Sequence, residues 1–400
     1  MGLTATSELE EFLGIDKIGL QPKYCKCEAE RENQHANENT KQSLTQLEDG
    51  TYQVSLPWRK LPTGLPNNYD YDYAVKRFLN LKKQLKKKPR EWVVYAKQME
   101  DQLKRGVARR VPAAEFEQDM KDGHGMWFLP HFAEDSVTTP VRVVYVSKAR
   151  YLGHSLNDYL AKGDVVSPSI FDIGLRFREY EVGVVADISK MFQAVELNKE
   201  DARYHRYVYR ANPGELITVY ELTTVTFGDK SSPAAAVLAL RHVAQEHASE
   251  NPEIQRVITD QFYMDDLNDS QRAEDSVQQL KADLTGTLGK GKLNIRKWLS
   301  NKPTVCDPEY IPSNGETTVL GTTWNIEKDT LSVKKVESKD IFPTKRKILS
   351  KTASYYDVFG MLSGIIVRPK MLLQKMWRFD LGWDTPISPE SDLFTELKAL

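Results

Sequence analysis

Apolar residues along this chain of 400 residues follow two periodicities, which predict where helices and strands lie. Between residues 73 and 103 they recur at every third or fourth position, and Pro89 divides this stretch into two helices. Residues 141–146, VRVVYV, and 182–186, VGVVA, are instead short runs rich in β-branched residues. We expect both runs to be strands, the second of them buried and ending at Asp187.

The second half of the chain continues this alternation. Residues 233–248 are predicted to be helical, because a serine and a proline stand where a helix opens. Apolar residues over 257–264 predict a strand that enters a tight turn at Asp265 and Asp266. Further along, the pattern predicts a helix at 275–288, a strand at 320–324 and helices over 343–377. This order, without an internal repeat, indicates an α+β fold.

Residues 26–50 are polar and poor in aliphatic side chains, so we interpret them as a linker or flexible arm, with ordered structure beginning near Tyr52. Three cysteines are too few for a disulfide framework in a chain of this length and suggest a reducing compartment. The longest purely aliphatic run, near Ile365–Val367, is far shorter than a membrane span. We therefore expect a multi-domain globular chain that does not cross a membrane.

The formal net charge is -1, but basic residues are unevenly distributed. Residues 76–110 hold thirteen Lys and Arg against three acidic residues, and a second basic stretch runs from Lys334 to Arg378. Two such regions around a more neutral centre suit a cleft that grips a phosphate backbone. Solvated faces of surface helices explain either stretch, taken alone, equally well.

The segment with the most specific chemistry is Phe262-Tyr263-Met264-Asp265-Asp266-Leu267. Two adjacent carboxylates after an apolar strand cost desolvation and mutual repulsion, which a divalent cation relieves. A single aspartate, Asp187, closes the earlier apolar strand. If the two strands are neighbours, Asp187 and Asp265 can bridge two metal ions about 4 Å apart, the spacing used in phosphoryl transfer. Oxygen ligands alone favour magnesium or manganese.

These motifs resemble those of the reverse transcriptase family. Tyr263-Met264-Asp265-Asp266 matches the family's catalytic motif, and Asp187 matches its first aspartate motif, with Phe192 where an aromatic blocks a ribose 2'-hydroxyl. Phe227-Gly228 resembles the motif that supports the templating base and the incoming nucleotide. Leu320-Gly321 resembles the strand that grips the primer end. The resemblance implies substrate-binding roles for Phe192, Arg142, Phe227, Gly228, Tyr263 and Met264, and metal binding by Asp187, Asp265 and Asp266.

Finer features, spread in consistent order over residues 50–390, resemble the BEL/Pao type of long-terminal-repeat retrotransposon. They are Leu56-Pro57-Trp58, Leu65-Pro66-Asn67-Asn68, Phe128-Leu129-Pro130-His131, Arg142-Val143-Val144-Tyr145, Ser155-Leu156-Asn157-Asp158, Lys297-Trp298, Ser300-Asn301 and Thr344-Lys345-Arg346. The family's right-hand architecture implies an acidic N-terminal segment and linker at 1–50, fingers and palm at 51–330, and a thumb or start of the connection region at 331–400. An antiparallel palm sheet packed on helices is part of that expectation.

The implied function is RNA-directed DNA polymerisation by two-metal phosphoryl transfer onto a primer 3'-hydroxyl. Its cofactor would be Mg²⁺ or Mn²⁺, and its partners an RNA or DNA template with primer and deoxynucleoside triphosphates. Arg142 stands where the family holds the triphosphate, and a guanidinium suits that task. Lys290 and Lys292 lie where a lysine would protonate pyrophosphate, although exposed loop lysines are the commoner case. Family habit and the few cysteines imply a cytoplasmic location, in virus-like particles.

Two other interpretations remain beside the polymerase. Families of this type are often labelled as aspartic peptidases, but the chain has no Asp-Thr-Gly or Asp-Ser-Gly motif, which disfavours that activity. A degenerate element fragment that at most binds nucleic acid is the second. It is suggested by Val146, where relatives carry an aspartate, and by a short loop from Phe132 to Pro140 that lacks the expected lysine. Neither departure touches the three aspartates.

Overall fold

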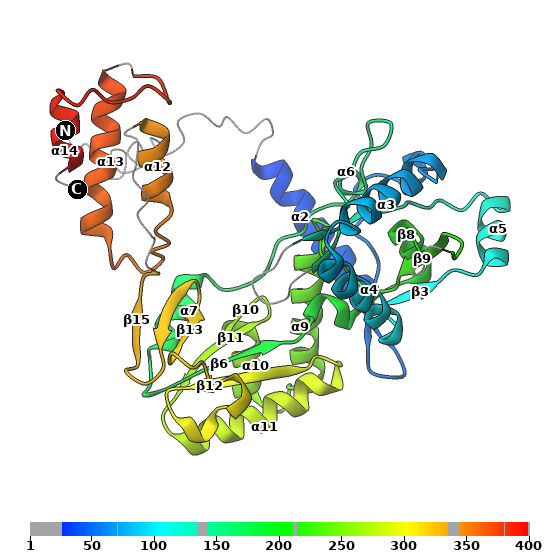
Figure 1. Ribbon diagram of the computed structural model, residues 1–400. Helices are drawn as coiled ribbons and strands as arrows, with labels where there is room; N and C mark the ends of the chain where they lie inside the picture. The colour runs from blue at the N-terminus through cyan, green and yellow to red at the C-terminus, as the bar shows by residue number, and fades with distance from the viewer. Residues whose placement is uncertain are drawn as a thin grey trace, which may run out of the picture. The chain divides into compact units, whose positions relative to one another are not determined.

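The computed structural model describes residues 26–69, 71–134, 142–210, 214–334, 344–379 and 381–398. The chain divides into two compact units. Unit 1 comprises residues 1–166 and 192–239, and unit 2 comprises residues 167–191 and 240–400. Helices and small, mostly antiparallel sheets occur in both, which confirms the expected α+β class (Figure 1). Each unit is described by itself below.

Unit 1 has a helical pair that the apolar periodicity predicts correctly. Helix α3 (Tyr71–Leu85) is followed by α4 (Pro89–Lys104), in which Pro89 occupies the first turn, where its missing N–H costs nothing. The other helices of this unit are α2 (Lys26–Ser43), α5 (Ala113–Lys121), α6 (Leu156–Tyr159) and α8 (Lys199–Ala202). One lysine of the basic stretch at 76–110 is not available to bind phosphate. Lys82 of α3 is 4% exposed, and its ammonium lies 5.2 Å from the Trp92 ring centroid.

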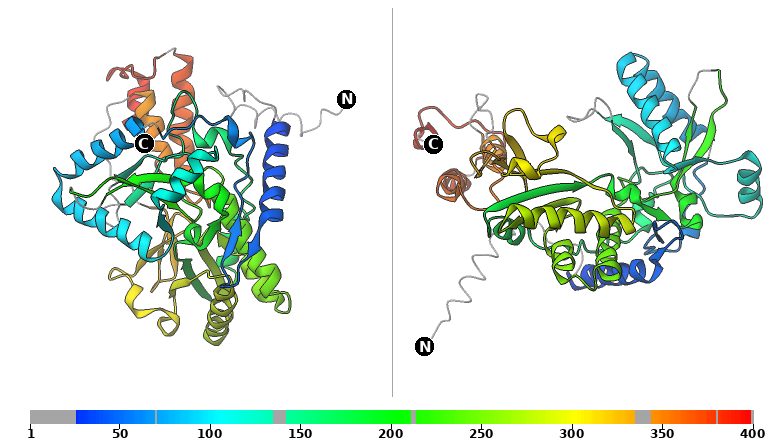
Figure 2. Two further views of the ribbon diagram at one scale, coloured as in Figure 1. Left: turned by 90° about the vertical axis from the view of Figure 1, so that its right-hand side faces the viewer. Right: turned by 90° about the horizontal axis from the view of Figure 1, so that it is seen from below.

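Three small sheets complete unit 1. In the first, β2 (Tyr52–Val54) pairs with β1 (Thr45–Gln46) and, in parallel, with β7 (Val195–Leu197). The second has the order β3-β9-β8, with bounds Ala108–Arg110, Thr218–Leu222 and Arg206–Tyr209. The third joins β4 (His131–Glu134) to the expected strand β5 (Arg142–Tyr145). Figure 2 shows the ribbon of the chain from two further sides.

The expectation of a linker at residues 26–50 is wrong for most of its length, because Lys26–Ser43 form helix α2. The helix is polar, and tertiary contacts stabilise it: Asn33 donates to the Asp164 carboxylate and Asn37 to the Asp164 carbonyl, each within 3 Å. Ala36 and Asn37 are buried. The polar composition of this segment therefore did not indicate a helix. The helix is stabilised by side-chain amides that donate hydrogen bonds to a distant segment, and the local sequence pattern does not show such contacts.

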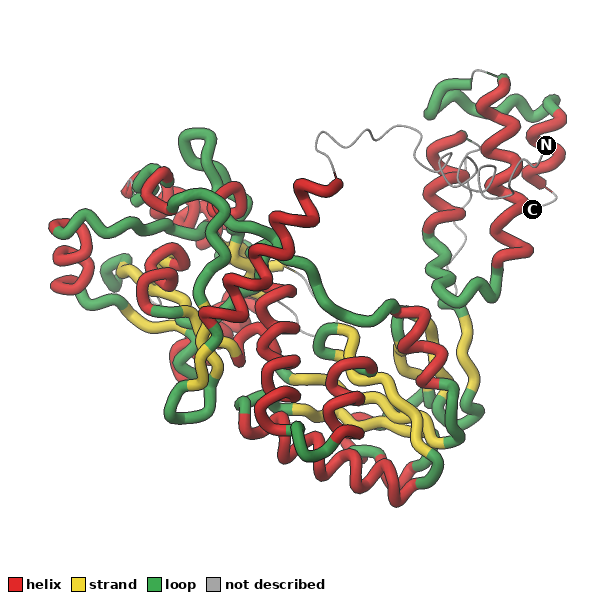
Figure 3. The backbone as a smooth tube through the Cα atoms, turned by 180° about the vertical axis from the view of Figure 1, so that it is seen from behind, coloured by secondary structure: helices red, strands yellow, loops and turns green. Residues whose placement is uncertain are grey.

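Unit 2 is built on a four-stranded antiparallel sheet in the order β10-β11-β6-β12. Its strands are β10 (Phe262–Tyr263), β11 (Asp266–Gln271), β6 (Val182–Ile188) and β12 (Ile295–Ser300). Helices α10 (Pro252–Asp260) and α11 (Glu274–Lys290) pack against the strands, and α7 (Ile170–Phe177) contacts β11 and β10. Figure 3 shows helices lying over one face of this sheet. The strand at β6 and the helix at α11 are as the sequence predicts.

Two local predictions in unit 2 are wrong. Val257 and Ile258 lie in helix α10 rather than in a strand, because Asn251 caps that helix and Pro252 fills its first turn. Leu320 and Gly321, expected in a strand, form the turn between β13 (Glu316–Val319) and β14 (Thr322–Asn325). Both have positive φ, 48° and 83°, which a two-residue hairpin turn requires. Strand β15 (Thr330–Ser332) completes this second sheet.

The C-terminal part of unit 2 is helical, as predicted. Helices α12 (Lys345–Ala353), α13 (Ser363–Arg378) and α14 (Asp392–Lys398) share a small core. That core comprises Ile348, Leu372, Leu373, Met376, Ile387 and Leu393. Helix α9 (Ser232–His247) begins in unit 1 and ends in unit 2, and its bounds match the predicted helix within one residue.

Candidate active site

Strand alternation decides where the Asp187 carboxylate points. Side chains along β6 face alternate sides of the sheet, and Val185, two residues before Asp187, packs against a cluster that contains Phe177 and Trp324. Gly183 lies on the same side, where an added Cβ would be 3.2 Å from the Trp324 ring. Asp187 follows at the end of this face, beyond the apolar cover, with a side chain 27% exposed. One face of β6 therefore changes from buried core at Val185 to the candidate site at Asp187 within two residues.

The two other aspartates lie in the adjacent hairpin. Tyr263 pairs with Asp266, so Met264 and Asp265 form a two-residue turn between β10 and β11. Met264 has a φ of 60°, a left-handed conformation that a turn of this length needs and that usually falls to glycine. Asp266 stands directly opposite Asp187 across the strands, which puts both side chains on the same face. The amide of Ile188 also donates to the Asp265 carbonyl at 2.8 Å.

Proximity of the three carboxylates shows in their electrostatics. Burial raises the pKa of Asp266 to about 6, and the charges of Asp265 and Asp187 contribute to that rise, while Lys297 opposes it. Part of the Asp266 surface is open to solvent, yet the surrounding protein still desolvates its carboxylate. Burial also raises the pKa of Asp265, and Asp187 adds to the effect. The repulsion expected between the adjacent Asp265 and Asp266 carboxylates is therefore present, and Asp187 adds to it.

A fourth residue of this cluster is Lys297, to which the sequence analysis gives no role at the site. Its ammonium nitrogen Nζ lies 2.9 Å from Asp187 Oδ2. The register of β12 against β6 shifts between Arg296 and Leu299, and Lys297 has a φ of 59°. This bulge directs the Lys297 side chain to the carboxylates. The position of a bulge cannot be predicted from a single sequence, which is why the sequence analysis missed Lys297. Arg296 Nε lies 3.8 Å from the other oxygen, Asp187 Oδ1.

The donor chemistry of the cluster suits a hard divalent cation, but its arrangement is not a ready cage. Asp187 Oδ1 is buried and accepts no hydrogen bond from the described residues. Within the described parts of the chain, no three His, Cys, Asp or Glu side chains are placed to hold a metal ion together. The ammonium of Lys297 is instead the cation that pairs with Asp187. Metal binding by Asp187, Asp265 and Asp266 therefore stays a prediction.

Unit 1 holds the other predicted substrate residues. Phe192 and Phe227 meet edge to face, with ring centroids 4.6 Å apart, and the Phe227 side chain is 48% exposed. Gly228, next to it, has a φ of 124°, and a Cβ there would lie 2.4 Å from the Tyr145 carbonyl oxygen. Only glycine fits such a backbone. Phe192 and Phe227, which were predicted separately, are thus in contact within one unit, beside a loop position that requires glycine.

A buried polar network fixes this loop. Asp229 accepts a hydrogen bond from the Ser147 hydroxyl, and its other oxygen lies 2.6 Å from His205 Nε2. All three side chains are at most 5% exposed. Asn157 holds the loop from outside, donating to the Gly228 carbonyl at 2.9 Å and accepting from the Lys230 amide at 3.0 Å. No motif in the sequence marks this network, because its members lie 24 or more positions apart.

Other predicted residues are less informative. Arg142 opens β5, pairs with Glu134 across the strands and is exposed. The loop expected to be short falls mainly on residues 135–141, which lie outside the described residues. Lys290 ends helix α11, and Lys292 follows in an exposed position with a φ of 56°.

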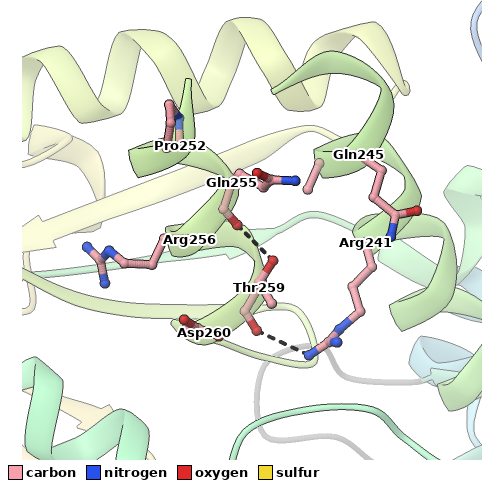
Figure 4. Close-up of a pocket in the computed structure, with 8 residues that line it drawn as sticks. Arg241, Gln245, Pro252, Gln255, Arg256, Thr259 and Asp260 are labelled. Atoms are coloured by element: carbon pink, nitrogen blue, oxygen red, sulfur yellow. Dashed lines mark hydrogen bonds between the residues drawn. The ribbon is translucent and has the colours of Figure 1, made fainter. Parts of the chain in front are cut away.

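A separate hollow of about 310 Å³ lies on unit 2 between the second half of α9 and helix α10 (Figure 4). Arg241 reaches across it and donates to the Thr259 carbonyl at 3.2 Å. Burial lowers the pKa of Arg241, and the nearby Asp260 carboxylate opposes that shift. None of the three clustered aspartates lines the hollow. The candidate site is therefore the hairpin face and not this depression.

Comparison with known proteins supports a retroelement origin. Residues 344–397 match the family described as the Pao retrotransposon-like RNaseH-like domain. The similarity to Pao retrotransposon proteins therefore rests on this C-terminal segment. The described part of the matched segment forms helices α12 to α14 and contains no strand. The match thus locates the family signature in the region assigned from sequence to a thumb or connection.

A solved structure shares the fold over a larger part of the chain. It is the foamy viral protease-reverse transcriptase in complex with double-stranded DNA, with a TM-score of 0.51 and 14% identity. The alignment covers 75% of this chain and 45% of that one, so this chain spans just under half of the length of the viral protein. No curated protein matches. In the described parts of the chain, every helix is too short or too polar to cross a membrane.

Proposed function

We propose that this chain is the polymerase portion of a reverse transcriptase from a retrotransposon of the Pao type. The observation that carries the proposal is the hairpin at Met264–Asp265, which puts Asp266 opposite Asp187 on one face of an antiparallel sheet. In the proposed reaction, a primer 3'-hydroxyl attacks the α-phosphorus of a deoxynucleoside triphosphate and pyrophosphate leaves. The likeness to a protease-reverse transcriptase supports this by fold alone.

In this proposal Asp187, Asp265 and Asp266 hold Mg²⁺ or Mn²⁺, which would polarise the phosphate and the primer hydroxyl. Raised carboxyl pKa values at Asp265 and Asp266 agree with such a role, because clustered acids that lack a cation resist ionisation. Tyr263, 37% exposed, and Met264 form the hairpin tip next to the carboxylates. Residues 51–330 would then be fingers and palm, and residues 331–400 a thumb or the start of a connection.

Within unit 1, the proposal gives nucleotide contacts to Phe192, Phe227 and Arg142. The Phe192 ring is packed against Phe227, which holds it in one orientation, as a residue that rejects a ribose 2'-hydroxyl by size must be held. Gly228 keeps the adjoining backbone close to Tyr145. Arg142 is exposed and suited to a bidentate phosphate contact. Template, primer and deoxynucleotides are accordingly the proposed partners.

The rival proposal is a degenerate fragment that at most binds nucleic acid. One observation favours it: Asp187 is engaged by Lys297, and the described residues contain no three-ligand metal group. A fragment of this type would keep its basic helices and bind a template without extending a primer. The two candidates therefore differ in catalysis and not in binding.

Primer extension separates the candidates. The natural chain and Asp265→Asn are compared on poly(rA)/oligo(dT) with Mg²⁺ or Mn²⁺, and template binding is followed by fluorescence anisotropy. We expect the variant to lose extension by on the order of a thousandfold and to bind template normally, because a metal-bridging carboxylate stabilises only the transition state. Asp283→Asn, an exposed change on α11, is the matched control and should keep full activity. Template binding without extension by either protein would establish the fragment instead.

A further inference from the structure

Lys297 is a cation placed among three carboxylates. Its Nζ is 2.9 Å from Asp187 Oδ2, and its charge acts on Asp265 and Asp266 as well. Arg296, at 3.8 Å from Asp187 Oδ1, is a weaker second partner. Among the described residues, these are the two cations that ion-pair with the cluster. The cluster therefore carries its own counter-charge.

The local backbone is arranged to keep the lysine there. In a regular strand, Arg296 and Lys297 would face opposite sides of the sheet, so only one could reach Asp187. The register shift between Arg296 and Leu299, together with the left-handed φ of 59° at Lys297, lets both approach the same carboxylate. A non-glycine residue in this conformation is strained and persists where surrounding contacts hold it. Trp298, which follows, is 2% exposed and anchors the bulge in the core.

We propose that Lys297 is a resident counter-ion of the carboxylate cluster, which a divalent cation must displace from Asp187 in order to bind. This inference rests on the proposed function, since it concerns the metal of the same site. Lys297, with Arg296, offsets part of the negative charge of the three carboxylates in the absence of a metal. Because the lysine side chain is 40% exposed, it can swing into solvent when a cation arrives.

Two consequences distinguish a displaceable counter-ion from an ordinary ion pair. Removing the lysine should strengthen metal binding, because the cation no longer competes for Asp187. It should also weaken the metal-free protein, because the carboxylates then repel one another without compensation. An ordinary ion pair would show only the second effect. A lysine unrelated to the cluster would show neither.

The test measures Mn²⁺ binding directly, by electron paramagnetic resonance of the free ion and by calorimetry, on the full chain. Lys297→Met should bind Mn²⁺ about five- to tenfold more tightly than the natural protein, as expected for loss of a partly exposed competing pair. Without metal its melting temperature should fall by about 2 to 4 °C, and saturating Mn²⁺ should restore it. Lys297→Arg keeps the charge and should leave the affinity within about twofold.

Lys302→Met is the matched control, since it removes the same charge outside the cluster, and it should change neither quantity. Equal Mn²⁺ affinity in the natural protein and in Lys297→Met, with binding abolished by Asp265→Asn, would overturn the counter-ion and leave the polymerase proposal standing. Absence of Asp265-dependent Mn²⁺ binding in every variant would overturn both. Should Lys297→Met not fold, Lys297→Gln, which keeps a polar side chain at the bulge, takes its place with the same expectations.

Discussion

Aspartates in the two units are stabilised in opposite ways. In unit 1, Asp229 is 5% exposed and has two partners, the Ser147 hydroxyl and the His205 ring. In unit 2, Asp265 and Asp266 are desolvated beside a third carboxylate, with Lys297 as the facing cation, and their pKa values are raised. The first arrangement gains stability from its charges. The second gives up stability to keep charges together.

This difference separates a structural carboxylate from a candidate catalytic one. A buried acid with complementary donors holds a loop, as Asp229 does beside Gly228. Acids that repel one another on a half-open face are retained only where a further partner completes them. Burial by itself does not distinguish a structural from a candidate catalytic carboxylate. The charges and hydrogen-bond donors around the carboxylate do.

The strongest way to break the comparison is Asp229→Ala. This change leaves His205 buried without its carboxylate and should cost about 3 to 5 kcal/mol of unfolding free energy. Denaturant unfolding followed by tryptophan fluorescence measures it. Asp122→Ala, an exposed aspartate of the same unit, should cost less than about 0.5 kcal/mol. Equal losses at the two positions would show that the network contributes little.

Acidification should weaken unit 1 through His131. Burial lowers the pKa of His131 from 6.5 to about 4, so the unfolded chain binds the proton first as pH falls. Stability is then lost between pH 6.5 and 4, by about 3 kcal/mol in full. His131→Gln should flatten this part of the profile of unfolding free energy against pH.

His205 provides the internal contrast in the same pH series. Burial alone would lower its pKa, but the Asp229 carboxylate 2.6 Å away outweighs burial and the pKa is raised. Its contribution is therefore present below pH 6.5 and lost as pH rises above that value. Asp229→Asn should remove the alkaline loss and leave the acidic loss due to His131. A profile unchanged by both substitutions would contradict the assignment.

Asp266→Asn sharpens the comparison from the side of unit 2. Asparagine keeps the shape of the residue and removes a charge that its neighbours disfavour, so unit 2 should gain about 1 kcal/mol after allowance for solvent screening. Differential scanning calorimetry without metal should show a higher melting temperature. Primer extension should be lost in the same variant. A lower melting temperature would mean that Lys297 compensates Asp266 fully.

Met264 gives the smallest expected effect. Its φ of 60° is strained for a side chain with a Cβ, so Met264→Gly should gain about 0.5 kcal/mol after the entropy cost of glycine. Met264→Val, with a branched Cβ, should instead lose about 1 kcal/mol. Thermal denaturation of the pair measures the difference between the two variants. Equal stability of the two would show that the turn is not strained.

Much of the secondary structure follows from sequence because it depends on neighbours in the chain. Pro89 opens α4, and the apolar run before Asp187 forms β6, since proline geometry and β-branched packing act locally. Failures occur where distant contacts prevail. The polar segment at 26–43 becomes a helix through Asn33 and Asn37, and residues 257–258 join a capped helix although their composition suits a strand.

For the candidate site, the sequence alone predicted which acids belong to it, because Tyr263-Met264-Asp265-Asp266 and the strand ending at Asp187 place charge directly after apolar runs. Only the tertiary structure decided what neutralises them. Lys297 reaches Asp187 through a bulge and a left-handed residue, 110 positions along the chain. Local pattern encodes the cost of burying a charge, whereas its compensation depends on which strands become neighbours.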